Sequence, residues 1–106
     1  MEVKKLENFT KGWIVGDFEP SIIRTKDFEV AVKRYKKGDR EETHFHKIAR
    51  EITVVINGIF RMNELILKAD DIVKLKREEN ANFECIEDGV TVVIKMPSII
   101  GDKYII

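Results

Sequence analysis

Residues 38–58 read GDREETHFHKIAREITVVING, and this stretch decides the fold. Its second half contains Ile52–Ile56, a run of β-branched residues that ends on Asn57-Gly58, a dipeptide typical of a tight turn. Its first half carries both histidines of the chain, His44 and His46, two residues apart. Because side chains alternate between the two faces of a strand, these imidazoles share a face. The stretch therefore predicts two strands, joined as a hairpin by a turn over residues 47–50.

The rest of the chain repeats this pattern of short strands. Segments rich in β-branched and aromatic residues recur about every ten residues, with turn residues between them. Apolar residues do not follow the spacing of an amphipathic helix, and residues 4–11 favour at most a turn. The pattern indicates an all-β sandwich or barrel. Further strands are expected at 28–32, 60–62, 65–67, 71–75 and 91–96, with turns at 63–64 and 87–89.

The two histidines and the glutamate that follows them are candidate metal ligands. In the predicted hairpin, Glu51 lies on the strand beside His44 and His46 and faces the same volume. Two imidazoles and a carboxylate on one side of a metal suit Fe(II), Mn(II), Ni(II) or Zn(II), with positions left open for water or substrate. For an isolated His-x-His pair, chance proximity on a charged loop is the better interpretation. Here the flanking glycines constrain the pattern as well.

The string Gly38-x5-His44-x-His46-x4-Glu51-x6-Gly58 resembles the first conserved motif of the cupin superfamily. The resemblance extends over about residues 28–96. It implies a closed, conical β-barrel of the double-stranded β-helix or jelly-roll type, with the metal site at its centre. The chain is expected to form one domain, residues 1–106, in which residues 1–27 pack on this barrel core.

The second motif of that family is incomplete in this chain. In cupins a later strand supplies a fourth ligand, a histidine, and the aligned position falls near Ala81. Asp70 stands where glycine is usual, and residues 76–82 replace the usual turn. A side-chain oxygen of Asn80 or Asn82 is the alternative fourth ligand. Otherwise three protein ligands are expected.

A ligand pocket is expected beside the metal. On the strand that precedes the motif, either Lys33 and Tyr35 or Arg34 faces inward, and the pattern leaves this phase open. The inward set is a candidate for anchoring an anionic or hydroxylated ligand, although a cation that reaches solvent is the simpler interpretation. With the orientations that the resemblance implies, the expected pocket residues are Tyr35, Phe60, Met62 and Phe83.

Composition narrows the range of partners. Nineteen Lys and Arg balance nineteen Asp and Glu, so no basic excess favours nucleic acid. No apolar run is long enough to span a membrane, and the first residues lack the apolar core of a secretory signal. The single cysteine, Cys85, fits a reducing compartment and a packed apolar position. A cytoplasmic protein that binds neither nucleic acid nor membrane is expected.

The outward face of the Glu51 strand predicts a homodimer. If Glu51 faces the pocket, Ile52, Val54 and Ile56 face away from it, although all three are large and apolar. Such a face needs a cover, which is either the N-terminal segment around Trp13 or a second subunit.

Three functions remain open at this level. The leading interpretation is a metal-dependent cupin that binds a small polar metabolite. This interpretation includes metal-dependent enzymes of the isomerase or dioxygenase type. The second is a non-catalytic module that binds a ligand or metal. The third is a metal-free cupin that modifies sugars or nucleotide sugars, with a histidine as general base and Glu51 to orient it.

Overall fold

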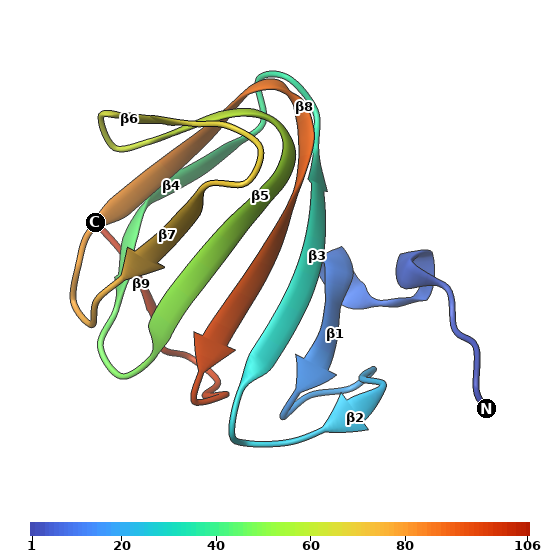
Figure 1. Cartoon of the computed structure of the whole chain (residues 1–106). Helices are drawn as coiled ribbons and strands as arrows, with labels where there is room; N and C mark the ends of the chain where they lie inside the picture. The colour runs from blue at the N-terminus through green and yellow to red at the C-terminus, as the bar shows by residue number, and fades with distance from the viewer.

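The structure is a computed structural model that describes all residues from Met1 to Ile106. It confirms the all-β class, with nine strands and two short 3-10 turns (Figure 1). Neither turn is long or apolar enough to cross a membrane as a helix. The elements are η1 (Leu6–Asn8), η2 (Thr10–Gly12), β1 (Trp13–Gly16), β2 (Ile23–Arg24), β3 (Glu29–Tyr35), β4 (Arg40–His46), β5 (Arg50–Met62), β6 (Leu65–Leu67), β7 (Ile72–Leu75), β8 (Ala81–Met96) and β9 (Lys103–Ile105).

The strands form one sheet that curls around an interior, with β8 as its central strand. One edge of β8 pairs with β4 and then β3, and the other edge pairs with β5. β1, β2 and β9 extend the sheet beyond β3 and β4, and β6 and β7 flank β5. Strand pairing does not close the circle, so the predicted closed barrel is an open double-stranded β-helix. One backbone bond, from Glu78 N to the His46 carbonyl at 2.6 Å, ties the β7–β8 turn to the end of β4.

β4 and β5 do not pair with each other, so the predicted hairpin is wrong. His44 pairs with Ala81 of β8, whereas Glu51 pairs with Lys95 near the other end of the same strand. The connection over residues 47–49 therefore crosses from one wall of the interior to the other. Hydrogen bonds with the long β8 replace the local pairing that the short connection suggested.

β5 and β8 bend where the sequence predicted turns. Asn57-Gly58 lies inside β5 and residues 87–89 lie inside β8, so both predicted turns are wrong. Gly58 has a φ of 88°, and a Cβ there would lie 2.5 Å from the Cα of Gly89. The register between the strands shifts at this point. The facing glycines let the two backbones approach and bend together as a bulge, and both strands continue.

The inward side chains of β3, β8 and β5 form rows across the sheet. One row holds Glu29, Lys95 and Glu51, and another holds Lys33, Thr91 and Val55. The row between them holds Ala31, Val93 and Thr53, so the charged side chains enter the interior from the two outer rows. The interior becomes apolar around the second half of β5. The apolar core consists of Val55, Phe60, Met62, Leu67, Leu75, Ala81, Phe83 and Cys85.

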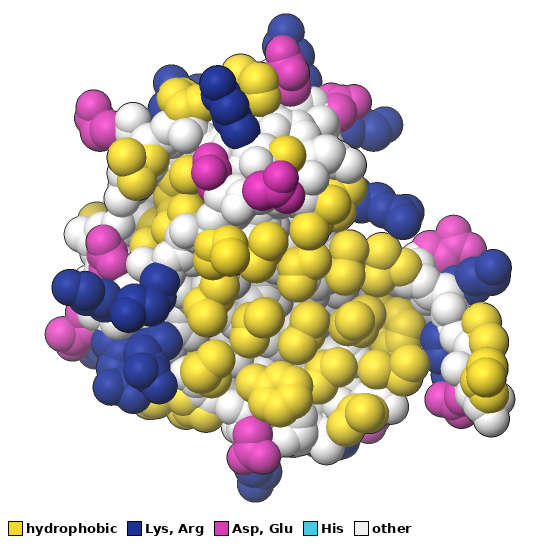
Figure 2. Space-filling view, in the orientation of Figure 1, with side chains coloured by type: hydrophobic (Ala, Val, Ile, Leu, Met, Phe, Trp, Pro, Cys, Tyr) yellow, Lys and Arg dark blue, Asp and Glu magenta, His cyan; other side chains and the backbone are white.

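The outward face of the same strands is apolar. Figure 2 shows hydrophobic side chains gathered over the middle of the molecule, where β3, β5 and β8 lie. The N-terminal segment does not cover this face, because β1 extends the sheet beside β3 instead. Ile56 and Ile72 are exposed there. The partly exposed members of this outer apolar face are Val30, Val32, Ile52, Val54, Val92 and Ile94.

Candidate functional site

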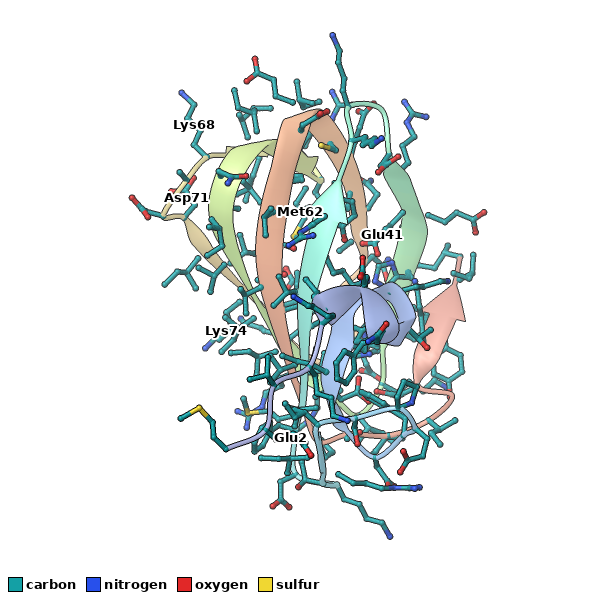
Figure 3. All side chains as sticks on the ribbon, turned by 90° about the vertical axis from the view of Figure 1, so that its right-hand side faces the viewer. Glu2, Glu41, Met62, Lys68, Asp71 and Lys74 are labelled. Carbon is teal, nitrogen blue, oxygen red and sulfur yellow. The ribbon has the colours of Figure 1, made fainter.

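A cavity of about 480 Å³ occupies the polar part of the interior. Its volume lies within the range usual for small-molecule sites. In Figure 3 the N-terminal turns lie in front of the sheet, and the labelled side chains of Glu41 and Met62 lie above them in this view. Its lining includes residues of both terminal segments, among them Lys11 and Lys103. Of the residues selected from the sequence, Tyr35, His44, His46, Glu51, Met62 and Phe83 line it.

His44 and His46 both face this cavity from β4. Each is 7% exposed, and their ring centroids lie 5.3 Å apart with the planes almost perpendicular. The Nδ1 of His44 lies 2.8 Å from the Glu42 carbonyl oxygen. Because a carbonyl oxygen only accepts, this nitrogen donates, and the Nε2 of the neutral ring keeps its lone pair. This arrangement orients His44 as metal-ligating histidines are commonly oriented.

His46 is held in its neutral form by its surroundings. Burial lowers its pKa to about 4, and the positive charge of Lys95 and the neighbouring His44 act in the same direction. A histidine must be neutral to bind a metal ion. The environment therefore keeps the His46 lone pair available at neutral pH.

Glu51 enters the cavity at the start of β5. Burial raises the pKa of its carboxyl group, and the nearby Lys95 opposes that rise. Its neighbours in the sheet are Lys95 on β8 and Leu75 on β7. The carbonyl of Glu42, and not Glu51, accepts the hydrogen bond of His44. Glu51 therefore does not orient His44 in the way that the metal-free function required.

A buried carboxylate holds the connection between β4 and β5. Asp102, 5% exposed, accepts hydrogen bonds from the backbone N–H groups of Lys47, Ile48 and Ala49 at 2.9–3.1 Å. These contacts fix the turn that separates the two histidines from Glu51. The sequence gives no signal for Asp102, because the residues it joins are more than fifty positions apart in the chain.

The donor set fits a divalent ion in kind, since two imidazoles and one carboxylate line one cavity. In the present side-chain conformations no group of three or more His, Cys, Asp or Glu residues is arranged to hold a metal ion. The position expected for a fourth ligand, Ala81, lines the cavity and pairs with His44. Asn80 and Asn82 are exposed and lie outside the cavity lining, which leaves three candidate protein ligands.

Of the three predicted aromatic pocket residues, two line the cavity and one packs behind them. Tyr35 and Phe83 face the cavity, whereas Phe60 is completely buried behind them. The Phe60 ring stacks on Phe83 at 5.0 Å and meets Tyr35 edge-on at 5.6 Å. Phe60 thus supports the lining and does not itself line the cavity. The open phase of β3 is resolved: Lys33 and Tyr35 face inward, and Arg34 is exposed.

Sequence reasoning named Lys33 but missed other charged residues of the cavity, among them Glu29, Glu41 and Lys95. Lys95 pairs with Glu29 at 3.1 Å, and Lys33 pairs with Glu41 at 3.6 Å. The available signal was the alternation of charged and apolar residues in β3 and at the end of β8, which places charges on the inner face. Without the strand pairing, this alternation did not show which face is inward.

No protein-family model and no curated protein sequence matches the chain. Its structure resembles a conserved protein with a double-stranded β-helix domain from Klebsiella pneumoniae, with TM-score 0.68 and 24% identity over 76% of this chain and 71% of that chain. It also resembles an RmlC-like cupin from Shewanella frigidimarina, with TM-score 0.66 and 18% identity over 72% of this chain and 71% of that chain. A third similar structure is the bacterial pirin YhhW from Escherichia coli in complex with nickel(II), with TM-score 0.67 and 15% identity over 82% of this chain and 39% of that chain. At these identities the likeness shows the fold alone.

Proposed function

Since the chain has the double-stranded β-helix fold of the cupins, we propose that it binds a small polar metabolite in its cavity, beside a divalent metal ion held by His44, His46 and Glu51. The observation that carries this proposal is that all three donors line one cavity of about 480 Å³. The likeness to a nickel(II) complex of bacterial pirin supports it, because that fold accommodates a metal.

The proposal assigns a role to each of the residues that form the site. The imidazoles of His44 and His46 are neutral ligands, and Glu51 is the anionic one. The Glu42 carbonyl keeps His44 in the ligating tautomer, and Asp102 holds the turn between the ligands. A divalent ion of iron, manganese, nickel or zinc supplies Lewis acidity, which polarises a carbonyl or hydroxyl group of the metabolite.

A non-catalytic binding module is the second candidate function. Ala81 favours it, because this position contributes no ligand and three protein ligands hold a metal less tightly than four. Both candidates use the same cavity and the same three donors. They differ in whether a bound metabolite is converted.

Elemental analysis of protein purified without a metal-affinity tag tests the metal. We expect about one divalent ion per chain in the wild type, and a large loss in His46→Ala and Glu51→Gln, because each change removes a ligand. Glu41→Gln is the matched control, since Glu41 lines the same cavity outside the proposed ligand set. Equal metal content in the wild type and all three variants would contradict the proposal.

We also propose that two chains associate through the outer apolar face. The face contains rows of aliphatic side chains in direct register, such as Val32 beside Val92 and Val92 beside Val54. Exposed apolar patches of this kind are uncommon on monomers, and symmetric pairs are the commonest assemblies. A homodimer would cover the face with an identical one.

A further inference from the structure

Two lysines of the cavity lie against the only tryptophan of the chain. Trp13 is the first residue of β1 and lines the cavity. The Nζ of Lys33 is 5.2 Å from the centroid of its ring, and the Nζ of Lys95 is 5.0 Å away. Both lysine side chains are largely buried, at 18% and 16% exposed. Two ammonium groups therefore converge on one aromatic ring inside the molecule.

Ion pairs with two glutamates hold these ammonium groups in place. Glu29 binds Lys95 through Oε1 at 3.1 Å and accepts a hydrogen bond from Ser98 through Oε2 at 2.8 Å. Ser98 Oγ in turn accepts the backbone N–H of Asp17 at 2.8 Å. Glu41 faces Lys33 at 3.6 Å. An ammonium group has three donors, so each lysine keeps donors beyond those its glutamate occupies.

Thr91 adds a hydroxyl group without a partner. It is 0% exposed, lines the cavity and is the direct neighbour of Lys33 across the β3–β8 pair. Its Oγ1 has no hydrogen-bond partner. A buried hydroxyl group left unpaired costs free energy, so a polar group of a ligand beside it stabilises the complex.

We propose that Trp13, Lys33, Thr91 and Lys95 form a subsite for a carboxylate group, and that the metabolite is a small organic acid. A carboxylate accepts several hydrogen bonds at once, and those from ammonium groups are the strong ones. A neutral amide can also accept a hydrogen bond from Thr91, but it lacks the negative charge that the two ammonium groups attract. This inference rests on the proposed function, because it assigns the chemistry of the metabolite in the same cavity.

The charges of the whole cavity agree with an acidic ligand in the metal-loaded protein. Four lysines and five carboxylates line it. A divalent ion at His44, His46 and Glu51 reverses this negative excess. A carboxylate is therefore expected to bind more tightly with the metal than without it.

Trp13 fluorescence provides a direct measurement, because no other tryptophan contributes. Glycolate and propionate serve as carboxylate probes, with glycolamide and propionamide as neutral counterparts of the same shape. Each is titrated into zinc-loaded protein and into protein kept in a chelator. We expect the carboxylates to bind about tenfold or more tightly than the amides, the usual effect of a charged hydrogen bond.

Variants locate the subsite. Lys33→Met and Lys95→Met are each expected to weaken glycolate binding about tenfold or more, and Thr91→Val to weaken it less. Lys74→Met is the matched control and should bind like the wild type, since Lys74 extends outward from β7 (Figure 3). If Lys95→Met does not fold, Lys95→Gln replaces it, and Lys33→Met still tests the subsite.

Equal affinity for carboxylates and amides overturns the inference, and so does wild-type glycolate affinity in both lysine variants. A lower melting temperature with unchanged affinity shows that the lysines only support the fold. Elemental analysis of each sample shows whether the metal is bound, so a failure of the subsite can be distinguished from a failure of the metal proposal. If the protein binds the metal but does not prefer carboxylates to amides, the subsite proposal is wrong and the metal proposal stands. Lysine-dependent glycolate binding in His46→Ala supports the subsite even where the metal is lost.

Discussion

At the scale of single residues, Ala81 determines how many ligands the candidate metal site offers. It is 2% exposed, pairs with His44 and lines the cavity. Ala81→His is expected to place a third imidazole beside the other two and to tighten zinc binding on the order of tenfold, about 1.4 kcal/mol. Competition with a fluorescent chelator measures this affinity.

Asn82→His is the control for that substitution. Side chains of adjacent strand residues point to opposite faces, and Asn82 is exposed. This variant should bind zinc like the wild type. The same gain in both variants would mean that the added imidazole acts outside the cavity.

The protonation of His46 predicts how stability depends on pH in the metal-free protein. Burial holds its pKa at about 4, below the 6.5 of an unfolded chain. Between these values the unfolded state binds the proton more readily, so stability falls as pH drops from 6.5 towards 4. Glu51, whose pKa is raised, acts in the opposite direction, because its folded form keeps a proton more readily.

A His46→Gln variant isolates the His46 contribution. Urea unfolding in a chelator at several pH values is expected to show a loss on the order of 2 kcal/mol in the wild type relative to the variant between neutral and acidic pH. Parallel pH profiles for the two proteins would contradict a lowered His46 pKa.

At the scale of elements, the shared bend of β5 and β8 lets both strands continue past the two facing glycines. The bend depends on Gly58, whose added Cβ would meet backbone atoms of Gly89, Asp88 and Glu87 within 3 Å. Gly58→Ala is expected to destabilise the fold by about 2–4 kcal/mol, because it adds both backbone strain and a clash that no side-chain movement relieves. The midpoint of denaturant unfolding measures the loss.

Gly38→Ala is the matched control for that substitution. Gly38 also has a positive φ, 93°, but no atom lies within 4 Å of its added Cβ. Only the strain remains, about 1 kcal/mol. Equal losses in the two variants would show that the approach of the two strands contributes nothing to stability.

At the scale of the whole molecule, the outer apolar face predicts the assembly. Light scattering is expected to give twice the chain mass of 12.4 kDa at micromolar concentration. Val54→Lys puts a charge between Val92 and Ile72 on this face and should shift the protein to the monomer mass. Ile48→Lys is the control, because Ile48 is exposed in the β4–β5 connection. A wild-type mass near that of one chain would reject the dimer.

The sequence by itself determined the all-β class, several of the strands and which residues of one strand share a face. The β-branched run of β5 and the spacing of His44 and His46 are local patterns, and alternation along one strand needs no distant partner. For that reason the strand content and the common orientation of both histidines were predictable. The cupin-like spacing added the fold and placed Ala81 where a fourth ligand is usual.

Only the tertiary structure decided how the strands pair and what the interior holds. Gly58 and residues 87–89 resemble turns locally, but their backbones pass each other and continue, because pairing along β5 and β8 outweighs the local preference. The Trp13–Lys33–Lys95 cluster and the bonds of Asp102 likewise join residues far apart in the chain. Long-range pairing and burial set these contacts, and a pattern of neighbouring residues does not encode them.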